Sequence, residues 1–236
     1  MEHLATVGLY SLVSGLTILI GGIISRLDGF PDSLIKERVL HAIVAFGGGV
    51  LIAAVAFVLT PRGIELLPTM YVAAFFLLGA YVFFVADRKI SRSGKPVAQL
   101  MAMLMDFIPE AIALGAVFAH DRNLGLLLAV FIGLQNLPEG FNSFRELVNK
   151  GFSPNKSLLI LLPLSLIGVI AACLGFIFLH NHPTTIAALM LFAGGGIIYL
   201  TFQDIAPMSS MEDHWSPALG ASFGFLVGML GQKLVG

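Results

Sequence analysis

The sequence predicts an all-α membrane protein with eight transmembrane helices, and three observations support this fold class. First, 57% of the 236 residues are hydrophobic and 11% are charged, with a mean hydropathy of +0.93. Soluble domains average about 45–50% apolar and about 25% charged residues. Second, the apolar runs are continuous rather than alternating, which favours helices over barrel strands. Third, the chain contains eight such runs.

Each run is close to the length that a membrane span requires, which is about 20 apolar residues. The predicted spans lie near residues 5–25, 39–59, 68–86, 98–119, 124–144, 157–179, 184–205 and 217–235. The connections between them are short and contain turn-forming residues, as at Ser93–Pro96. We therefore expect one transmembrane domain over residues 1–236, without a separate soluble domain.

Charge and cysteine content exclude several function classes. The formal net charge is -1, so no basic field is available to bind nucleic acid. The single cysteine, Cys173, excludes a disulfide framework and any multi-cysteine metal site. We expect membrane lipid as the surroundings of the chain and no resident cofactor.

The basic residues predict the orientation of the chain. Ten of the 13 Lys and Arg residues fall in the first, third and fifth connections between spans. Cytoplasmic loops carry an excess of Lys and Arg, so these connections are predicted to be cytoplasmic and both termini to lie outside. The connection after the seventh span has no Lys or Arg and carries Glu212, Asp213 and His214 instead.

Two pairs of segments indicate inverted repeats. Gly48 precedes Pro61 by the same 13 residues as Gly194 precedes Pro207, and both glycines lie in Gly-rich stretches. The second and seventh spans that carry them are predicted to run in opposite directions. Repeats of this kind, with interrupted helices, are typical of transporters. We expect repeats over about 1–86 and 157–236, flanking a central helix pair at about 98–148. Close helix packing is the alternative explanation for the glycines.

The fourth and fifth spans carry a cluster of polar residues at membrane depth. Asp106 and Glu110 are four residues apart and so share one helical face, and Gln135, Asn136 and Glu139 lie three or four apart on the next span. Ionisable groups inside a membrane cost roughly 2.5–3.5 kcal/mol each on insertion scales and usually serve a function. If the two helices face each other, three carboxylates and two amides come together.

A divalent cation is the partner that this cluster favours. It would neutralise two of three mutually repelling charges. Pro109 and Pro138 interrupt the two helices and free backbone carbonyls that could supply further oxygen ligands. The alternative is a kinked helix pair whose protonated acids hydrogen-bond to the amides.

At these residues the chain resembles the ZIP family (Zrt-, Irt-like proteins) of divalent-metal transporters. Residues 135–140 (Gln-Asn-Leu-Pro-Glu-Gly) are similar to the metal motif of the family's fifth span. Residues 106–111 (Asp-Phe-Ile-Pro-Glu-Ala) stand where its fourth span usually reads His-Asn-X-Pro-Glu-Gly. The Gly-rich second and seventh spans are also similar. The resemblance implies a three-plus-two-plus-three helix arrangement, a metal site between the fourth and fifth spans, transport toward the cytoplasm and a homodimer.

Carried over by position, the resemblance assigns Asp106, Glu110, Gln135, Asn136 and Glu139 to the metal site. Asp106 replaces the histidine of the family pattern and Phe107 replaces its asparagine. The first change leaves only oxygen ligands, which favour manganese, magnesium or ferrous iron over zinc. The second weakens or removes one of two adjacent metal subsites. Zinc, manganese, ferrous iron and cadmium are the candidate cargo ions.

Other polar residues leave two interpretations open. His41 is either a ligand on the inner exit path or an interfacial histidine. His180 and His182 either capture metal at the outer face or are solvated. His214 either accepts metal at the inner mouth or is solvated, and Asp204 either lines the exit or caps the local backbone.

The predicted function is inward transport of a divalent metal in a cell membrane, either a plasma membrane or a bacterial inner membrane. Two alternatives remain. One is an intramembrane enzyme that uses the acid pair, although no nucleophile with a separate base lies beside the acids. The other is a relative that binds metal without transporting it.

Overall fold

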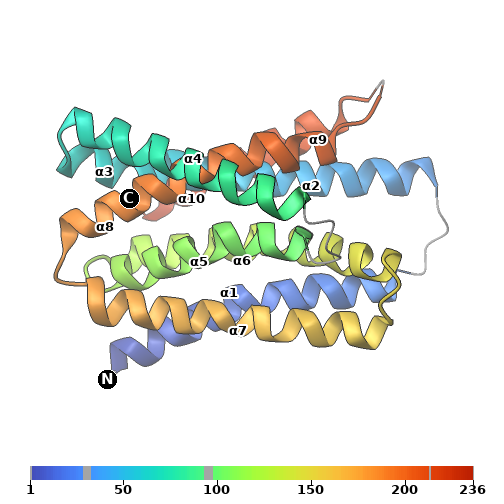
Figure 1. Ribbon diagram of the computed structural model, residues 1–236, viewed down its shortest axis with the longest axis horizontal. Helices are drawn as coiled ribbons and strands as arrows, with labels where there is room; N and C mark the ends of the chain where they lie inside the picture. Colours follow the sequence, from blue (N-terminus) through green and yellow to red (C-terminus); the bar gives the residue numbers. More distant parts are fainter. Residues whose placement is uncertain (1, 29–32, 93–97, 213, 236) are drawn as a thin grey trace.

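A computed structural model describes residues 2–28, 33–92, 98–212 and 214–235 (Figure 1). The predicted turn at Ser93–Pro96, with Lys95, and the inner-mouth residue Asp213 lie outside the described residues. The helices in chain order are α1 (Glu2–Leu27), α2 (Leu34–Ala54), η1 (Val55–Leu59), α3 (Thr60–Leu66), α4 (Thr69–Arg92), α5 (Ala98–Phe118), α6 (Arg122–Asn149), α7 (Pro154–Leu179), α8 (Pro183–Leu200), η2 (Thr201–Ile205), α9 (Ala206–Ser209) and α10 (Ser216–Val235).

The prediction of an all-helical membrane protein is confirmed. Within the described residues, seven helices are long and apolar enough to cross a membrane. Two of these are composite: α2, η1 and α3 form one stretch over Leu34–Leu66, and α8, η2 and α9 form another over Pro183–Ser209. The predicted span at 98–119 corresponds to α5, a 21-residue helix that is not among the seven.

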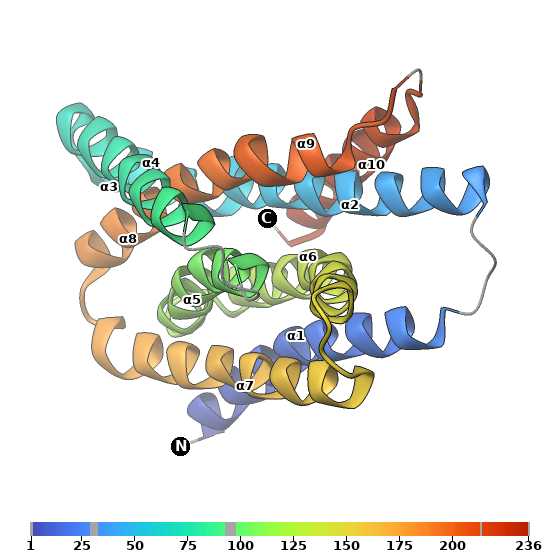
Figure 2. The same cartoon turned by 45° about the vertical axis from the view of Figure 1, so that its right-hand side comes forward.

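The helices form three layers (Figures 1 and 2). The middle layer consists of α5 and α6, with α1 and α7 on one side and the remaining long helices on the other (Figure 2). Both chain termini lie at the same end of the bundle (Figure 1). The middle layer therefore has protein on both faces, and Asp106, Glu110, Gln135 and Asn136 are buried in it.

Helix contacts come in matched pairs on the two sides of the middle layer. α1 packs on α6 as α7 packs on α5, and α2 packs on α10 as α8 packs on α4. Burial follows the same pairing for the most apolar 18 residues of each span. The buried share is 39% for both α1 and α7, 61% for both composite helices, and 11% for both α4 and α10. The first three spans (α1, the first composite helix and α4) and the last three (α7, the second composite helix and α10) thus occupy equivalent environments.

Each composite helix contains one π-helical turn directly before a proline. η1 precedes Thr60-Pro61 and η2 precedes Ala206-Pro207. Proline lacks an N–H and its ring clashes with the carbonyl four residues earlier. The wider turn accommodates this, since the N–H groups of Thr60 and Ala206 bond to carbonyls five residues back. Such turns reorient the side chains that they carry and are frequent at functional sites.

Glycines bring α1 into close contact with α6. A Cβ atom on Gly140 would lie 2.1 Å from the carbonyl oxygen of Ile18, and one on Gly21 would lie 2.1 Å from that of Leu137. Small residues at crossings are how membrane helices pack closely. This crossing fixes the segment of α6 that carries Asn136 and Glu139.

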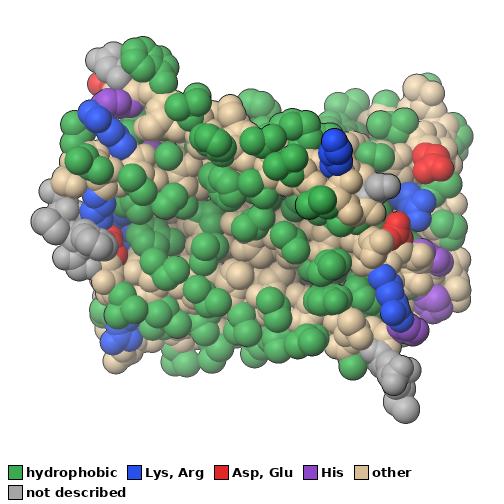
Figure 3. All heavy atoms as spheres, turned by 180° about the vertical axis from the view of Figure 1, so that it is seen from behind, with side chains coloured by type: hydrophobic (Ala, Val, Ile, Leu, Met, Phe, Trp, Pro, Cys, Tyr) green, Lys and Arg blue, Asp and Glu red, His purple; other side chains and the backbone are tan. Residues whose placement is uncertain are grey.

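The outer surface is apolar around the middle of the molecule. Figure 3 shows hydrophobic side chains across the central band, with Lys and Arg toward both ends and most of the visible histidines at one of them. Large exposed side chains include Leu9, Phe178 and Leu230. This distribution is that of a protein whose central band faces lipid rather than water.

Candidate metal centre

The polar residues predicted to form the site lie in the middle layer. Asp106 and Glu110 come from α5, and Gln135, Asn136 and Glu139 come from α6. Asp106, Glu110, Gln135 and Asn136 are each at most 3% exposed, and Glu139 is partly buried. Both helices continue through an internal proline, Pro109 in α5 and Pro138 in α6.

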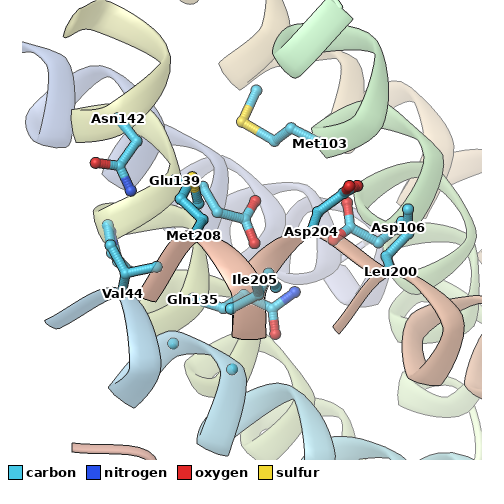
Figure 4. Close-up of a pocket in the computed structure, with 13 residues that line it drawn as sticks. Val44, Met103, Asp106, Gln135, Glu139, Asn142, Leu200, Asp204, Ile205 and Met208 are labelled. Carbon is cyan, nitrogen blue, oxygen red and sulfur yellow. The ribbon is translucent and has the colours of Figure 1, made fainter. Parts of the chain in front are cut away.

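A small cavity of about 30 Å³ lies where α2, α5, α6 and η2 meet (Figure 4). Asp106, Gln135 and Glu139 line it, so three of the five predicted residues share one space. Among the described residues that line the cavity, none is Lys, Arg or His. This volume has room for water-sized groups, which suits a single ion better than an organic substrate.

The other two predicted residues lie beside the cavity rather than in its lining. Gln135 Nε2 donates a hydrogen bond of 2.5 Å to Glu110 Oε2, which links Glu110 to a lining residue. Asn136 Nδ2 donates a 3.3 Å bond to the carbonyl oxygen of Ser14 on α1. Asp106 Oδ1 accepts a 2.8 Å bond from the Phe107 amide.

Four oxygen atoms of this group are buried without a hydrogen-bond donor. They are Glu110 Oε1, Gln135 Oε1, Asn136 Oδ1 and Glu139 Oε2. Most buried polar atoms in proteins have a partner, and leaving one without costs about 1–3 kcal/mol, or more when it is charged. The group therefore has an excess of acceptors, which a cation can satisfy and a further acceptor cannot.

The carboxylates repel one another without forming a compact ligand triad. Glu139 lies within electrostatic range of Asp106 and Glu110, and Asp106 also interacts with Asp204. In the part of the chain that the structure describes, no three His, Cys, Asp or Glu side chains converge closely enough to hold one ion. The Glu110–Gln135 bond holds one of the carboxylates to an amide instead.

Phe107, at the position of the family's asparagine, packs away from the cavity. Its side chain is fully buried, and a Cβ on Gly168 would lie 2.3 Å from the ring's Cζ atom. Gly15 of α1 also lies against this ring. The aromatic ring thus fills space between α5 and two outer helices and offers no ligand.

Two polar residues of the lining, Asp204 and Asn142, were not among the five predicted ligands. Asp204 lies on η2, whose π-helical turn presents it to the cavity beside Asp106 (Figure 4). Asn142 lies three residues after Glu139 and so shares its helical face. The signal for Asn142 was this spacing. The sequence feature that could have indicated Asp204 was Pro207, three residues later, because a proline there predicts an irregular turn.

The histidines lie outside this cavity. His41 lines a second, larger cavity near the C-terminal end of α6. Its Nδ1 atom is buried without a hydrogen-bond partner. His180 Nδ1 lies 2.9 Å from the carbonyl oxygen of Phe176, and its ring stacks on that residue, as expected of a helix-end side chain. His182 is exposed and His214 is partly buried.

Comparisons with known proteins identify the family. The sequence model described as ZIP Zinc transporter matches residues 96–232, more than half of the chain and including α5 and α6. The chain belongs to the ZIP zinc transporter family. The predicted family is therefore confirmed. Because this is a family of membrane transporters, the enzyme interpretation of the acid pair is excluded.

This ZIP chain is also similar to a curated protein, zinc transporter ZIP13 of Gallus gallus. The two are 27% identical over 125 residues, which is 51% of this chain and 33% of that protein. The chain thus matches about one third of the length of this relative.

Proposed function

We propose that this chain transports a divalent metal ion through the cavity between α5 and α6, with Asp106, Glu110, Gln135, Asn136 and Glu139 as its ligands. The observation that carries the proposal is the excess of buried acceptors described above: four oxygen atoms without a donor. Asp204 adds a further carboxylate to the cavity lining. A bound divalent cation would supply the positive charge that these oxygen atoms lack.

Binding requires a small rearrangement of the Gln135 side chain. Its amide group now bonds to Glu110 through nitrogen, while its oxygen has no donor. An ion between the helices would take over as the partner of Glu110, and the amide oxygen could turn toward it. This explains how a set of two amides and three carboxylates serves an ion that no carboxylate triad holds in place.

The all-oxygen ligand set bears on which metal is carried. Membership of the family favours zinc, while oxygen ligands favour harder ions such as manganese and ferrous iron. The two expectations differ because Asp106 stands where the family pattern has a histidine. We infer that the chain carries zinc together with harder ions, with manganese, ferrous iron and cadmium as further cargo candidates.

The paired environments of the outer helices support the inverted-repeat architecture. We infer that about 1–86 and 157–236 are the repeats and that the central pair at about 98–148 lies between them. The matched contacts, the equal burial and the two π-helical turns are what such repeats produce. Alternating access then follows from movement of the central pair against the repeats.

The basic loops give the proposed orientation of the chain, and the family resemblance implies transport toward the cytoplasm. The end of the bundle with the α6–α7 turn carries Arg145, Lys150 and Lys156, which we assign to the cytoplasm. Both termini then lie outside. The proposed location is a plasma membrane or bacterial inner membrane. The sparsely buried helices α4 and α10 offer surfaces for lipid or for a homodimer.

Metal uptake into proteoliposomes tests the function. Glu110→Ala and Glu139→Ala are each expected to reduce zinc and manganese uptake at least tenfold, because each removes one of the acceptors. Glu65→Ala, an exposed acid on α3, is the control and should transport normally. Normal uptake in both site variants would refute the site.

The same assay separates transport from binding alone. A relative that binds metal without moving it would retain metal on the purified protein but show no uptake above protein-free vesicles. Uptake that depends on Glu110 and Glu139 supports the transporter. Metal binding without uptake would contradict it.

A further inference from the structure

A second cavity adjoins the metal centre on the side of the basic loops. Its volume is about 710 Å³, and helices α2 and α6 form most of its walls. It shares Val44, Asn142 and Met208 with the small cavity described above. These three residues border both the buried site and this larger space, and we call them the neck and the larger space the vestibule.

One face of α2 and one face of α6 run from the metal centre past the neck into the vestibule. On α6 the face carries Gln135, Glu139, Asn142 and Glu146, at spacings of four, three and four residues. Residues at such spacings line up on one side of a helix. An ion leaving Glu139 therefore meets side chains of the same face at each turn.

The opposing face of α2 has the same spacing in the reverse direction. It carries Gly48 at the metal centre, Val44 at the neck, and His41 and Glu37 in the vestibule. His41 and Glu37 are one helical turn apart and offer an imidazole and a carboxylate to the same space. The His41 Nδ1 atom is buried without a hydrogen-bond partner.

The basic residues that line the vestibule are already engaged. Lys36 Nζ lies 2.8 Å from Asp28 Oδ2. The Arg145 guanidinium lies 5.9 Å from the centre of the Phe141 ring. On the facing helix, Glu146 is paired with Lys150. The unpartnered His41 nitrogen and the Glu37 carboxylate are thus the imidazole and the acidic group of this lining that remain for a cation.

We propose that Glu37 and His41 form a second, weaker binding site for the divalent cation on its way out of the metal centre. This inference rests on the proposed function, because it takes the vestibule as the release side. Two protein ligands completed by water bind an ion more loosely than the buried group, as release requires. The imidazole adds the nitrogen ligand that the buried group lacks, and nitrogen suits zinc.

Pulsed electron paramagnetic resonance with Cu²⁺ as the probe tests this site directly, because a bound imidazole gives a nitrogen modulation that carboxylates do not. The chain has six histidines. Replacing the other five with Gln leaves His41 as the sole imidazole of the 236-residue chain. This variant is expected to show the modulation, and adding His41→Gln should abolish it. Absence of the modulation in a monodisperse His41-only protein would overturn the proposal.

The carboxylate ligand is tested in the same background. Glu37→Gln should weaken Cu²⁺ binding at His41 by tenfold or more, since even losing a hydrogen-bond partner of a ligand costs about 10–100-fold. Glu65→Gln is the matched control at the other end of the bundle and should leave the affinity unchanged. Equal affinity in Glu37→Gln and its control would remove Glu37 from the site.

Failure of this proposal is distinguishable from failure of the transport site. Glu139→Gln in the same background should abolish zinc uptake while leaving the His41 modulation intact. Uptake that survives Glu139→Gln would refute the buried site. A His41 modulation that disappears with Glu139→Gln would show that no separate release site exists.

Discussion

Asp106 gives the cavity wall on α5 a carboxylate where the family pattern has an imidazole. Its side chain is 3% exposed, and one carboxylate oxygen is held by the Phe107 amide at 2.8 Å. The other oxygen is left for a partner in the cavity. Since Asp204 lies beside it, the charge density here is higher than a single carboxylate provides. Such a wall favours strongly charged, hard cations.

Asp106→His is therefore expected to shift the cargo preference toward zinc. An imidazole at this position should raise zinc uptake relative to manganese about tenfold, equivalent to about 1.4 kcal/mol of differential binding. Competition between the two ions in proteoliposomes measures the ratio. Asp106→Asn is the control, because it removes the charge but keeps an oxygen ligand. An unchanged ratio in Asp106→His would contradict the ligand argument.

The five predicted ligands could be located from sequence because their spacing fixes their faces. Asp106 and Glu110 are one helical turn apart, as are Gln135 and Glu139, so two facing helices must bring them near each other. The hydrogen bond between Gln135 and Glu110 could not be predicted, since rotamers depend on packing. Nor does spacing along one helix reveal that Asn136 bonds to the backbone of α1.

At the scale of elements, the π-helical turns decide which side chains reach the cavity. Pro207 predicted an interruption of the seventh span, but sequence alone does not say whether a kink, a break or a wider turn results. The wider turn adds one residue and rotates what precedes it, which brings Asp204 to the lining. In the matching turn, η1, the residue three before Pro61 is Val58, which is buried.

The crossing of α1 and α6 gives a test of packing. Gly140→Ala places a Cβ 2.1 Å from the Ile18 carbonyl oxygen, so the helices must separate. Overpacking of this kind costs about 1–3 kcal/mol. We expect a lower thermal unfolding midpoint in detergent and reduced uptake.

Gly133→Ala on the same helix is the matched control. Its nearest neighbour, the Ser14 Cα, would lie 3.6 Å from the new Cβ, which is ordinary contact. It should be neutral or stabilising by up to about 1 kcal/mol, because Ala favours helix more than Gly does. Equal midpoints for the two variants would contradict the close crossing of α1 and α6.

At the scale of the whole molecule, the outer helices are arranged symmetrically, but the cavities along the proposed path of the ion are not. The outer helices are paired in contacts and burial, yet the two larger cavities that share lining residues with the small one both lie along α2 and α6. A transporter that alternates between two states needs the scaffold to be nearly equal in energy both ways. The polar side chains then determine which end the ion reaches in each state.

Orientation is testable by labelling single cysteines from either side of a sealed vesicle. In a Cys173→Ser background, Asn149→Cys lies in the vestibule and Thr184→Cys at the opposite end, both at exposed positions. An impermeant maleimide should label Thr184→Cys in right-side-out vesicles and Asn149→Cys only in inverted ones. The reverse pattern would overturn the assigned orientation and the placement of the vestibule on the cytoplasmic side.

The most direct measurement is anomalous X-ray scattering from crystals soaked with zinc, manganese or cadmium. The predicted result is a peak between α5 and α6, about 2.0–2.6 Å from carboxylate oxygens of Glu110 and Glu139. Peaks confined to surface histidines such as His182, with none between the two helices, would contradict the central claim that a divalent ion supplies the charge missing from this group.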